Sequence, residues 1–445
     1  MDVYQEYKGK CCTADQAVQV VKDGDWVDYG MSCAYPTALD KALARRQGDL
    51  KDIKVRNAIS CHPVAILEAD PENETFTYNL WHCSAIDRKY LDAGRAYHEP
   101  MLFRDCGSYY RRGFAPVNVA MITVAPMDRH GNFSFGLTNG CTQEMLDAAE
   151  TIIVEVNPNM PVVFGMGSDH IHVSKVQAIV ESQEAVSLAP NREPSAIDKQ
   201  IAENIFPYLH DGITLQLGIG GMPNALGILI AESDLKDLGM HTELMSDGYL
   251  NLYKAGKITN DKKPFQRGKG VFSICMGSKE LYEFLDHNQD VLSAPMHYVN
   301  NPETIRQLDD FISINSCIAA DLYGQVCSES AGTRHISGTG GQLDFVTGAY
   351  AADHGKAFLA MPSSRVDKKG VRHSNILPKF TAGDIITTPR TQAPYMVTEY
   401  GVANLSGLAT WQRAEALINI AHPDMREDLI KAAEAQRIWR RSNKI

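Results

Sequence analysis

Short apolar stretches rich in β-branched residues alternate along this chain with longer stretches of helical periodicity. The strand-like runs are 25–29, 53–57, 119–124, 151–156 and 178–180 in the first half, and 213–217, 270–275, 311–314 and 357–360 in the second. Helical patterns cover 37–46, 197–209, 224–232, 279–286 and 411–437. Because strands that alternate with helices form mostly parallel sheets covered on both faces, we predict an α/β fold.

The pattern also contains an internal repeat. Stretches 23–39 and 211–226 both read Asp-Gly, five residues, Gly, a loop, and then Pro-x-Ala-Leu. A second pair, 124–134 and 319–328, follows at nearly the same separation and shares an Asp-x-x-Gly turn. Two matches in the same order predict a duplication into two similar open α/β domains with mostly parallel sheets, spanning 1–190 and 195–445. The boundary is expected between Pro190 and Pro194, where Pro-Asn-Arg-Glu-Pro interrupts the pattern.

The two copies differ in their glycines. The loop of the first copy carries only Gly30, whereas that of the second carries Gly218, Gly220 and Gly221. Glycines permit positive φ and close approach to a ligand, and a strand–loop–helix junction can hold a phosphate or an oxyanion on backbone N–H groups. The alternative is a tight turn with Pro223 near the first helical position. The loop lacks the third glycine of a dinucleotide fingerprint, and the chain contains no P-loop motif.

A second glycine cluster strengthens the ligand interpretation. Gly338, Gly340 and Gly341 lie within four residues, among small polar side chains. If both loops follow strands of one sheet, both face its carboxyl edge, where open α/β sheets bind ligands. Gly341 could then present its N–H to a carbonyl oxygen, although two unrelated loops remain the alternative.

One acidic residue follows the first of these loops in an otherwise uncharged stretch. Glu243 is flanked by His241-Thr242 and Leu244-Met245. An ordinary surface glutamate is the common case, whereas a catalytic role needs a nucleophilic carboxylate that is partly desolvated yet ionised. Asp247 is the second candidate, but Asp-Gly is also typical of a turn.

Other catalytic chemistries have weaker support. His170 and His172 share one face of an extended segment but lack a clear third ligand, so we predict no metal site. The ten cysteines are scattered without a C-x-x-C pair, which favours reduced thiols. The nucleophile elbow G-x-S-x-G is absent, although a Ser-His-Asp triad stays open.

Bulk properties narrow the class of partner. A chain of 445 residues with 44% hydrophobic and 22% charged residues is typical of a globular enzyme with two domains. Its net charge of −11 argues against nucleic acid or an anionic membrane surface as partner, but it allows a local basic pocket. We read neither a signal peptide nor an apolar run of about 18 residues, so we expect a cytoplasmic protein without a membrane partner.

Several motifs together resemble one known family. They are 216–225, His241-Thr242-Glu243, 336–345, 397–401 and 414–423. The chain is identified by them as similar, over almost its whole length, to the acetyl-CoA hydrolase/transferase family of class I coenzyme A transferases. Within that family, the stretches 24–30, 410–415 and 437–443 most resemble butyryl-CoA:acetate CoA-transferases. The 4-hydroxybutyrate CoA-transferases are the next most similar group.

The resemblance implies a ping-pong transfer of CoA from butyryl-CoA, or a similar short-chain acyl-CoA, to acetate. Glu243 would attack the thioester, and a glutamyl-CoA thioester would follow. The residues implied in CoA binding are Gly218, Ile219, Gly220, Gly221, Met222, Ile318, Gly341 and Lys368. Asn300 would be a neighbour of the active site. Acyl-CoA is then a substrate alongside acetate and butyrate, no cofactor is bound permanently, and the chain is expected to form a homo-oligomer.

Three other functions stay open at this point. A short-chain acyl-CoA hydrolase would let water resolve the intermediate. A sugar-phosphate isomerase would use related α/β layers without acyl exchange, since fold does not fix function. A non-catalytic CoA-binding regulator would not need Glu243. The acyl chain is not set by the sequence either, because one methylene in an apolar pocket is worth only about 1–3 kcal/mol.

Overall fold

The structure is a computed structural model that describes residues 2–189 and 193–443. Its chain divides into two compact units. The first contains Met1–Pro190 with Glu243–Met245 and Val271–Val299, and the second contains Asn191–Thr242, Ser246–Gly270 and Asn300–Ile445. The boundary expected between Pro190 and Pro194 falls mostly on residues 190–192, which lie outside the described residues.

A seven-stranded sheet forms the centre of the first unit, and all its pairings are parallel. Its spatial order is β4 (Ala96–His98), β3 (Phe76–Leu80), β2 (Ile53–Ala58), β1 (Trp26–Met31), β5 (Val119–Val124), β7 (Thr151–Val156) and β9 (Ala178–Glu181). The chain builds outward from β1 to β4 and then returns to add β5 on the other side of β1. The topological switch point of this sheet therefore lies between β1 and β5.

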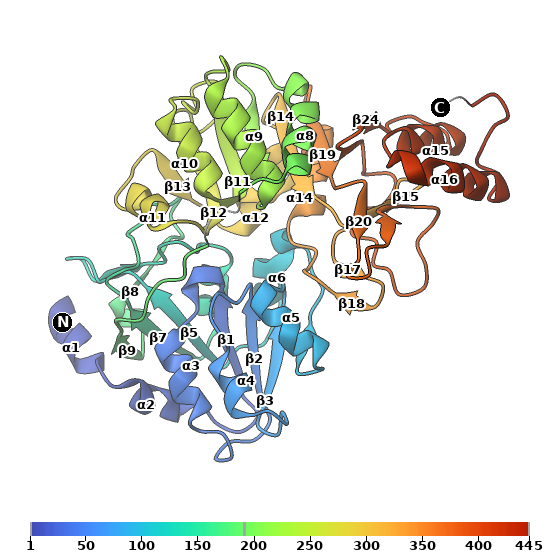
Figure 1. Cartoon of the computed structure of the whole chain (residues 1–445). Coiled ribbons are helices and arrows are strands. Elements are labelled where there is room, and N and C mark those ends of the chain that lie inside the picture. Colours follow the sequence, from blue (N-terminus) through green and yellow to red (C-terminus); the bar gives the residue numbers. More distant parts are fainter. Residues whose placement is uncertain (1, 190–192, 444–445) are drawn as a thin grey trace. The chain divides into compact units, whose positions relative to one another are not determined.

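Helices cover both faces of this sheet (Figure 1). On β5, Val119 and Met121 belong to one buried cluster, whereas Ile122 and Val124 belong to the other. This alternation explains why β5 reads as an unbroken apolar run, since both of its faces are buried. The helices of the first half are α1 (Val3–Lys10), α2 (Ala14–Ala17), α3 (Thr37–Ala44), α4 (Ala65–Ala69), α5 (Ala85–Asp92), α6 (Cys106–Arg111) and α7 (Thr142–Ala148). A separate two-stranded antiparallel sheet pairs β6 (Asn132–Ser134) with β8 (His170–His172).

The second sheet has eight strands and repeats the same topology. Its order is β13 (Val291–Ser293), β12 (Gly270–Cys275), β11 (Gly239–Met245), β10 (Thr214–Leu217), β14 (Phe311–Ser316), β19 (Lys356–Ala360), β23 (Tyr395–Thr398) and β24 (Gly401–Asn404). The edge strand β24 is antiparallel to β23. By position β10 corresponds to β1 and β14 to β5, so the second switch point lies between β10 and β14. The prediction of a duplicated, mostly parallel α/β fold is confirmed.

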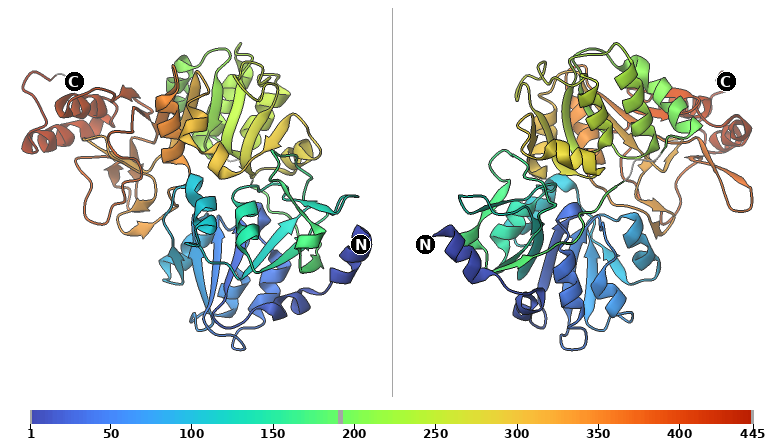
Figure 2. Two further views of the ribbon diagram at one scale, coloured as in Figure 1. Left: turned by 180° about the vertical axis from the view of Figure 1, so that it is seen from behind. Right: turned by 60° about the vertical axis from the view of Figure 1, so that its left-hand side comes forward.

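The elements around the second sheet are shown from two further directions in Figure 2. The helices are α8 (Ala196–Ile205), α9 (Gly221–Glu232), α10 (Asp247–Lys254), α11 (Lys279–Leu285), α12 (Met296–Val299), α13 (Pro302–Ile305), α14 (Gln342–Ala351), α15 (Thr410–Asn419) and α16 (Pro423–Ala435). Short strands form small sheets from β15 (Ala319–Asp321), β16 (Val326–Cys327) and β22 (Ile376–Leu377), from β17 (Ser330–Ala331) and β18 (Arg334–His335), and from β20 (Ser364–Val366) and β21 (Arg372–Ser374).

The repeat extends to individual hydrogen bonds. The Asp23 carboxylate accepts from the backbone N–H of Lys51 at 2.9 Å, and the Asp211 carboxylate accepts from that of Lys236 at 3.0 Å. In both copies the glycine after the aspartate has positive φ and donates its N–H to the same lysine's carbonyl. The Asp-Gly pair thus binds the start of β1, and that of β10, to the segment that leads into the neighbouring strand, β2 or β11.

The second repeated motif is equally similar in the two copies. The Asp128 carboxylate accepts from the backbone N–H groups of residues 130 and 132, both at 2.8 Å. The Asp321 carboxylate accepts from those of residues 323 and 325, at 3.1 and 2.9 Å. Gly131 and Gly324 have φ values of 88° and 85°, a conformation that favours glycine. Both motifs of the repeat therefore encode the same local structures.

The helix predicted over 411–437 is wrong as a single element. The structure ends α15 at Asn419 and begins α16 at Pro423. His422 is extended, at φ −55° and ψ 131°, because a residue before proline is pushed out of the α region. The apolar periodicity continues across the break, which is why the pattern suggested one helix.

Candidate functional site

The first glycine loop lies at the carboxyl end of β10, beside the switch point. Gly218 donates its N–H to the Ile314 carbonyl of β14 at 2.9 Å, so the loop starts against that strand. Gly220 caps α9 with a φ of 125°, which side chains rarely adopt. Ile219 between them is 58% exposed. Pro223 is the third residue of α9, in the first turn, where N–H groups have no intrahelical acceptor.

A carboxylate lies at the start of α9. Asp198 of α8 lies so close to Gly221 that a β-carbon on Gly221 would be only 2.9 Å from the Asp198 Cγ atom. The same carboxylate accepts hydrogen bonds from the Ser195 N–H at 2.9 Å and the Ser195 hydroxyl at 2.7 Å, in the capping box of α8. Negative charge near a helix N-terminus is favourable. This part of the glycine loop is therefore already next to an anion of the chain itself.

A buried tyrosine supports the strand that carries the loop. The Tyr249 hydroxyl accepts from the Leu217 N–H at 2.7 Å and donates to the Leu215 carbonyl at 3.3 Å. These backbone groups of β10 point away from β14, on the side where a neighbouring strand would normally bind them. Burial raises the pKa of Tyr249 well above its usual range, so the hydroxyl stays protonated. Tyr249 thus replaces a strand at the end of β10 and fixes the start of the loop.

The second glycine loop is also held by a buried amide. Gly340 has positive φ, and the buried Gly341 caps α14. Gln342, the first residue of α14, accepts from the Ser328 hydroxyl at 2.8 Å and donates to the Thr388 hydroxyl at 3.0 Å. These bonds tie the helix start to two other segments and limit the movement of Gly341. The α14 helix packs against β14 and β19.

Glu243 lies on β11, two residues before the strand ends at Met245 and four residues before α10 begins at Asp247. Its side chain is partly exposed, whereas those of His241, Thr242 and Leu244 are buried. Asp247, the other acidic candidate, begins α10 and is 6% exposed. A partly exposed carboxylate among buried neighbours has the mixed environment that a nucleophilic glutamate needs.

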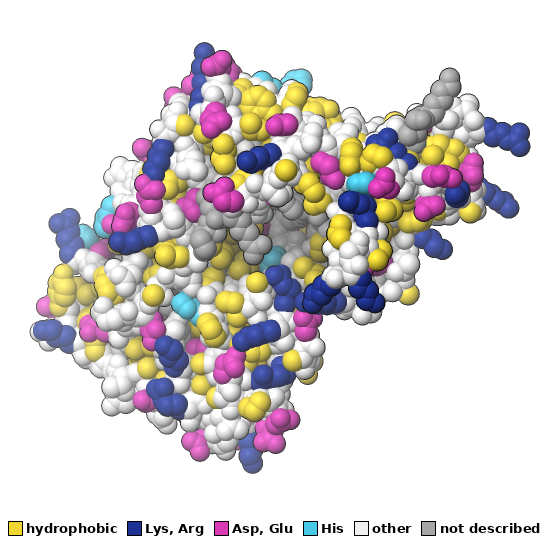
Figure 3. Space-filling view, viewed as in Figure 1, with side chains coloured by type: hydrophobic (Ala, Val, Ile, Leu, Met, Phe, Trp, Pro, Cys, Tyr) yellow, Lys and Arg dark blue, Asp and Glu magenta, His cyan; other side chains and the backbone are white. Residues whose placement is uncertain are grey.

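The remaining predicted CoA contacts lie in the second unit. Ile318 follows the end of β14 by two residues, is partly exposed, and donates its N–H to the Cys327 carbonyl at 2.9 Å. Lys368 is exposed at the tip of the β20–β21 hairpin, where Asp367 accepts from the N–H groups of Lys369 and Val371. Several Lys and Arg side chains lie over the region of β17, β18 and β20 in Figure 3. The hairpin therefore offers an exposed cation on a short fixed turn.

Sequence reasoning assigned no role to three polar residues below the first loop. Gln216 is 3% exposed, Ser313 is fully buried, and Asn315 is partly exposed. Their side chains form one hydrogen-bonded group between β10 and β14. A signal was present in the sequence, because Ser313 and Asn315 interrupt an otherwise apolar strand at every second position.

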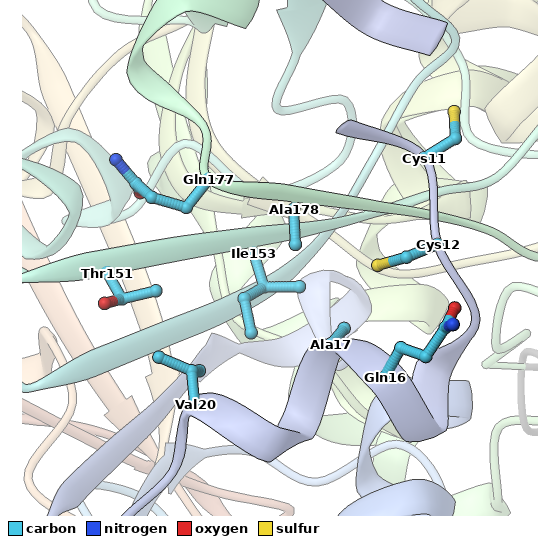
Figure 4. A pocket seen from close by; sticks show the side chains of 9 residues that line it. All are labelled: Cys11, Cys12, Gln16, Ala17, Val20, Thr151, Ile153, Gln177 and Ala178. Atoms are coloured by element: carbon cyan, nitrogen blue, oxygen red, sulfur yellow. The ribbon is translucent and has the colours of Figure 1, made fainter. Parts of the chain in front are cut away.

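Two surface hollows of the first unit are lined by residues other than the predicted site residues. One, of about 540 Å³, lies at the amino ends of β7 and β9, opposite the edge where parallel sheets bind ligands. Figure 4 shows the Cys12 thiol turned toward it and the Cys11 thiol turned away. The other, of about 580 Å³, is lined by 158–161, 185–188 and α11 residues. All ten cysteines have free thiols, as predicted.

The two histidines of β8 have local partners instead of a shared ligand. His170 Nδ1 lies 3.0 Å from an Asp169 oxygen, and His172 Nδ1 lies 2.8 Å from the Ser174 hydroxyl. Both contacts are with residues one or two positions away in the chain. Within residues 2–189 and 193–443, no helix is long and apolar enough to cross a bilayer.

Known proteins are similar to this chain in sequence and in fold. Residues 1–190 match the acetyl-CoA hydrolase/transferase N-terminal domain, and residues 277–433 match the C-terminal domain of the same family. The butyryl-CoA:acetate CoA-transferase of Anaerostipes caccae is 47% identical over 446 residues, which cover 100% of both chains. The chain belongs to the acetyl-CoA hydrolase/transferase family.

Two other proteins extend the similarity. The 4-hydroxybutyrate coenzyme A transferase of Clostridium kluyveri is 39% identical, with 97% of this chain and 98% of that protein covered. The crystal structure of RipA from Yersinia pestis has a TM-score of 0.91 at 34% identity, covering 98% of this chain and 100% of that one. The similarity therefore holds in sequence and in fold over nearly the full length.

Proposed function

We propose that this protein is a short-chain acyl-CoA transferase that moves CoA from butyryl-CoA to acetate. The observation that carries the proposal is the full-length, 47% identity to a butyryl-CoA:acetate CoA-transferase. The partly exposed Glu243 and the two supported glycine loops are the chemical parts that such a reaction needs.

In the proposed mechanism, the Glu243 carboxylate attacks the thioester carbonyl of butyryl-CoA. The C–S bond breaks, giving a mixed anhydride and CoA thiolate. The thiolate then attacks the glutamyl carbonyl, and butyrate leaves with the anhydride oxygen. Acetate attacks the resulting glutamyl-CoA thioester, and the same two steps in reverse give acetyl-CoA and regenerate the Glu243 carboxylate. No proton has to be transferred, so the reaction needs a carboxylate and oxyanion donors but no general base.

Each addition creates a negative oxygen that backbone N–H groups can stabilise. One such donor contributes roughly 3 kcal/mol to the transition state. We assign this role to Gly341, whose position is held through Gln342. The loop Gly218 to Met222 would bind CoA together with Ile318, and the exposed Lys368 would attract its phosphates. Self-association of the chain stays a prediction.

The direct test replaces the nucleophile. Glu243→Gln should abolish transfer while CoA still binds, because the amide cannot form the anhydride. Glu203→Gln, which changes an exposed glutamate of α8, is the matched control and should keep full activity. Incubation of the wild type with butyryl-CoA but no acetate, followed by borohydride or hydroxylamine, should label the peptide that contains Glu243. Wild-type turnover by Glu243→Gln would contradict the assignment.

Substrate assays separate this function from its alternatives. Initial rates are measured for acetyl-, propionyl-, butyryl- and 4-hydroxybutyryl-CoA, with and without acetate. A transferase consumes the CoA ester only when a carboxylate acceptor is present. Consumption without acceptor would instead show a hydrolase, and a rate highest for 4-hydroxybutyryl-CoA would move the activity toward the Clostridium kluyveri relative.

A further inference from the structure

A small polar group lies at the switch point of the second sheet, where the surrounding strands are apolar. It consists of Gln216 on β10 and of Ser313 and Asn315 on β14. Gln216 pairs with Ser313 in the register of the two strands, and Asn315 is two residues further along. Gln216 and Ser313 are buried, whereas Asn315 is partly exposed beside Gly218. The group therefore connects the sheet interior to the base of the glycine loop.

The hydrogen bonds of this group hold both ends of the Asn315 amide. Asn315 Nδ2 donates to Gln216 Oε1 and to Ser313 Oγ, both at 3.0 Å, so both of its N–H groups are used. Asn315 Oδ1 accepts from Gln216 Nε2 at 3.1 Å. The Ser313 hydroxyl donates to Gln216 Oε1 at 2.7 Å. A carbonyl oxygen has two lone pairs, so Asn315 Oδ1 keeps one acceptor position while its nitrogen is committed inside the group.

The first copy of the repeat has a different polar group at the equivalent place, because Asp28, the counterpart of Gln216, binds the Tyr110 hydroxyl and the Arg56 guanidinium instead of an amide. The registers of β1 with β5 and of β10 with β14 equate Ala120 with Ser313 and Ile122 with Asn315. Ile122 is fully buried, and its methyl group would lie 3.3 Å from a β-carbon on Gly30, the counterpart of Gly218. At the first switch point an apolar side chain thus occupies the place of Asn315. At the second switch point the partly exposed amide oxygen of Asn315 takes that place. Its polar partners Gln216 and Ser313 are buried, which is costly unless they are fully hydrogen-bonded.

We propose that Asn315 Oδ1 accepts a hydrogen bond from the amide N–H that lies two carbons from sulfur in the pantetheine arm of acyl-CoA. This rests on the proposed function, and it assigns the neutral arm of CoA to the first glycine loop. The free lone pair of Asn315 Oδ1 needs a hydrogen-bond donor, and the pantetheine arm carries two amide N–H groups. Phosphate oxygens are acceptors, so they do not suit this oxygen. The Asp198 carboxylate beside Gly221 would also repel them.

Gln216 and Ser313 are positioning residues in this proposal, since they act only through Asn315. They hold the amide in one orientation before substrate arrives, which lowers the ordering cost of binding. The alkyl part of a short acyl chain has no donor and gains nothing from this oxygen. Asn315 therefore distinguishes thioesters by their thiol part and is indifferent to the acyl chain.

The test compares two thioesters that differ in one N–H group. S-butyryl-N-acetylcysteamine has an amide two carbons from sulfur, and S-butyryl-2-mercaptoethyl acetate has an ester oxygen in place of that N–H. Rates with acetate are corrected for the uncatalysed reactivity of each thioester. Because a typical hydrogen bond contributes about 1 kcal/mol, the wild type should prefer the amide in kcat/KM by about fivefold to tenfold. Asn315→Leu should lose this preference.

The preference is a ratio within one protein, so it does not depend on the folded fraction of a variant. Ser316→Ala, which changes the exposed neighbour on β14, is the control and should keep the wild-type ratio. Gln216→Leu should reduce the ratio without removing Asn315. Butyryl-pantetheine, which keeps both amides but lacks the nucleotide, is compared with butyryl-CoA in the same variants. Asn315→Leu should leave that second ratio unchanged.

Three outcomes would overturn the proposal. The first is a wild type that shows no preference for the amide over the ester, a result that needs no variant. The second is an Asn315→Leu protein that keeps the wild-type preference. The third is a variant that changes only the ratio of butyryl-CoA to butyryl-pantetheine, which would place Asn315 at the nucleotide. Failure of the proposed function is a separate result, since the wild type would then transfer no CoA from butyryl-CoA to acetate.

Discussion

The Asp198 carboxylate occupies the space that a side chain on Gly221 would need. Gly221 is the first residue of α9, and its φ is not in the glycine-favouring region, so space and not backbone conformation requires glycine there. A methyl group at this position would push Asp198 out of its capping box with Ser195. The contact therefore links the start of α9, the helix after the first glycine loop, to the start of α8.

Gly221→Ala is expected to destabilise the protein and to raise KM for acyl-CoA. Overpacking typically costs about 1–3 kcal/mol, and the displaced carboxylate no longer caps α8. Gly227→Ala on the same helix is the matched control, because its β-carbon would meet nothing closer than 3.7 Å. That control should be neutral or stabilising by about 0.5–1 kcal/mol through helix propensity. Urea unfolding of both variants checks the difference, and equal midpoints would contradict the steric argument.

Tyr249→Phe tests the support of β10. The change removes the hydroxyl that accepts from Leu217 N–H and donates to Leu215 C=O, and leaves both buried groups without this partner. We expect a loss of about 1–3 kcal/mol in the free energy of unfolding. Tyr350→Phe removes a hydroxyl from a side chain that is 53% exposed and should change little.

The same tyrosine variant should also affect the loop that follows β10. KM for acyl-CoA should rise more than kcat falls, because in the proposed mechanism the loop binds CoA while Glu243 performs the chemistry. Steady-state kinetics at saturating acetate measures both constants. A stability loss with unchanged KM would show that Tyr249 supports the sheet alone.

Lys263 gives a pH-dependent prediction. Its side chain is 1% exposed, and Nζ donates to the Met240 carbonyl at 3.2 Å and the Lys269 carbonyl at 2.8 Å. Burial lowers the pKa of Lys263 to about 7. In the unfolded chain the lysine pKa is near 10.4, so between pH 7 and about 10 the unfolded state binds the extra proton. The free energy of unfolding therefore gains a contribution that increases with pH in this window.

Lys263→Met should remove that contribution. The unfolding free energy of the wild type minus that of the variant should increase as the pH rises from 7 to 9.5, measured by urea unfolding at each pH. Below pH 7 both states bind the proton and the difference should stop changing. Lys262→Met, at the exposed neighbouring position, should follow the wild type throughout. A difference that stays constant between pH 7 and 9.5 would contradict this, because it would show that Lys263 is charged in the folded protein.

The sequence predicted the strands well where both faces of a strand are buried. The bounds of β5, β7 and β12 agree with the predicted runs 119–124, 151–156 and 270–275. Such strands are continuous apolar runs, so composition alone marks them. The C-terminal helix pattern failed at Pro423, because periodicity records a shared apolar face and does not record backbone continuity. The two Asp-Gly pairs were also visible in sequence as a repeated motif, although their bonds to Lys51 and Lys236 were not.

The first glycine loop and the repeat that contains it could likewise be found from sequence, because glycines that need positive φ or close packing are local requirements. The contact of Asp198 with Gly221 and the bonds of Tyr249 to β10 could not, since they join residues from different elements. The pairing of Gln216 with Asn315 shows the reason most clearly. These residues are far apart in sequence and meet only because β14 is placed beside β10 at the switch point. Sequence by itself determined the class of fold, the duplication and the glycine positions. Strand order, which depends on how the whole chain packs, decided which polar side chains meet beneath the loop.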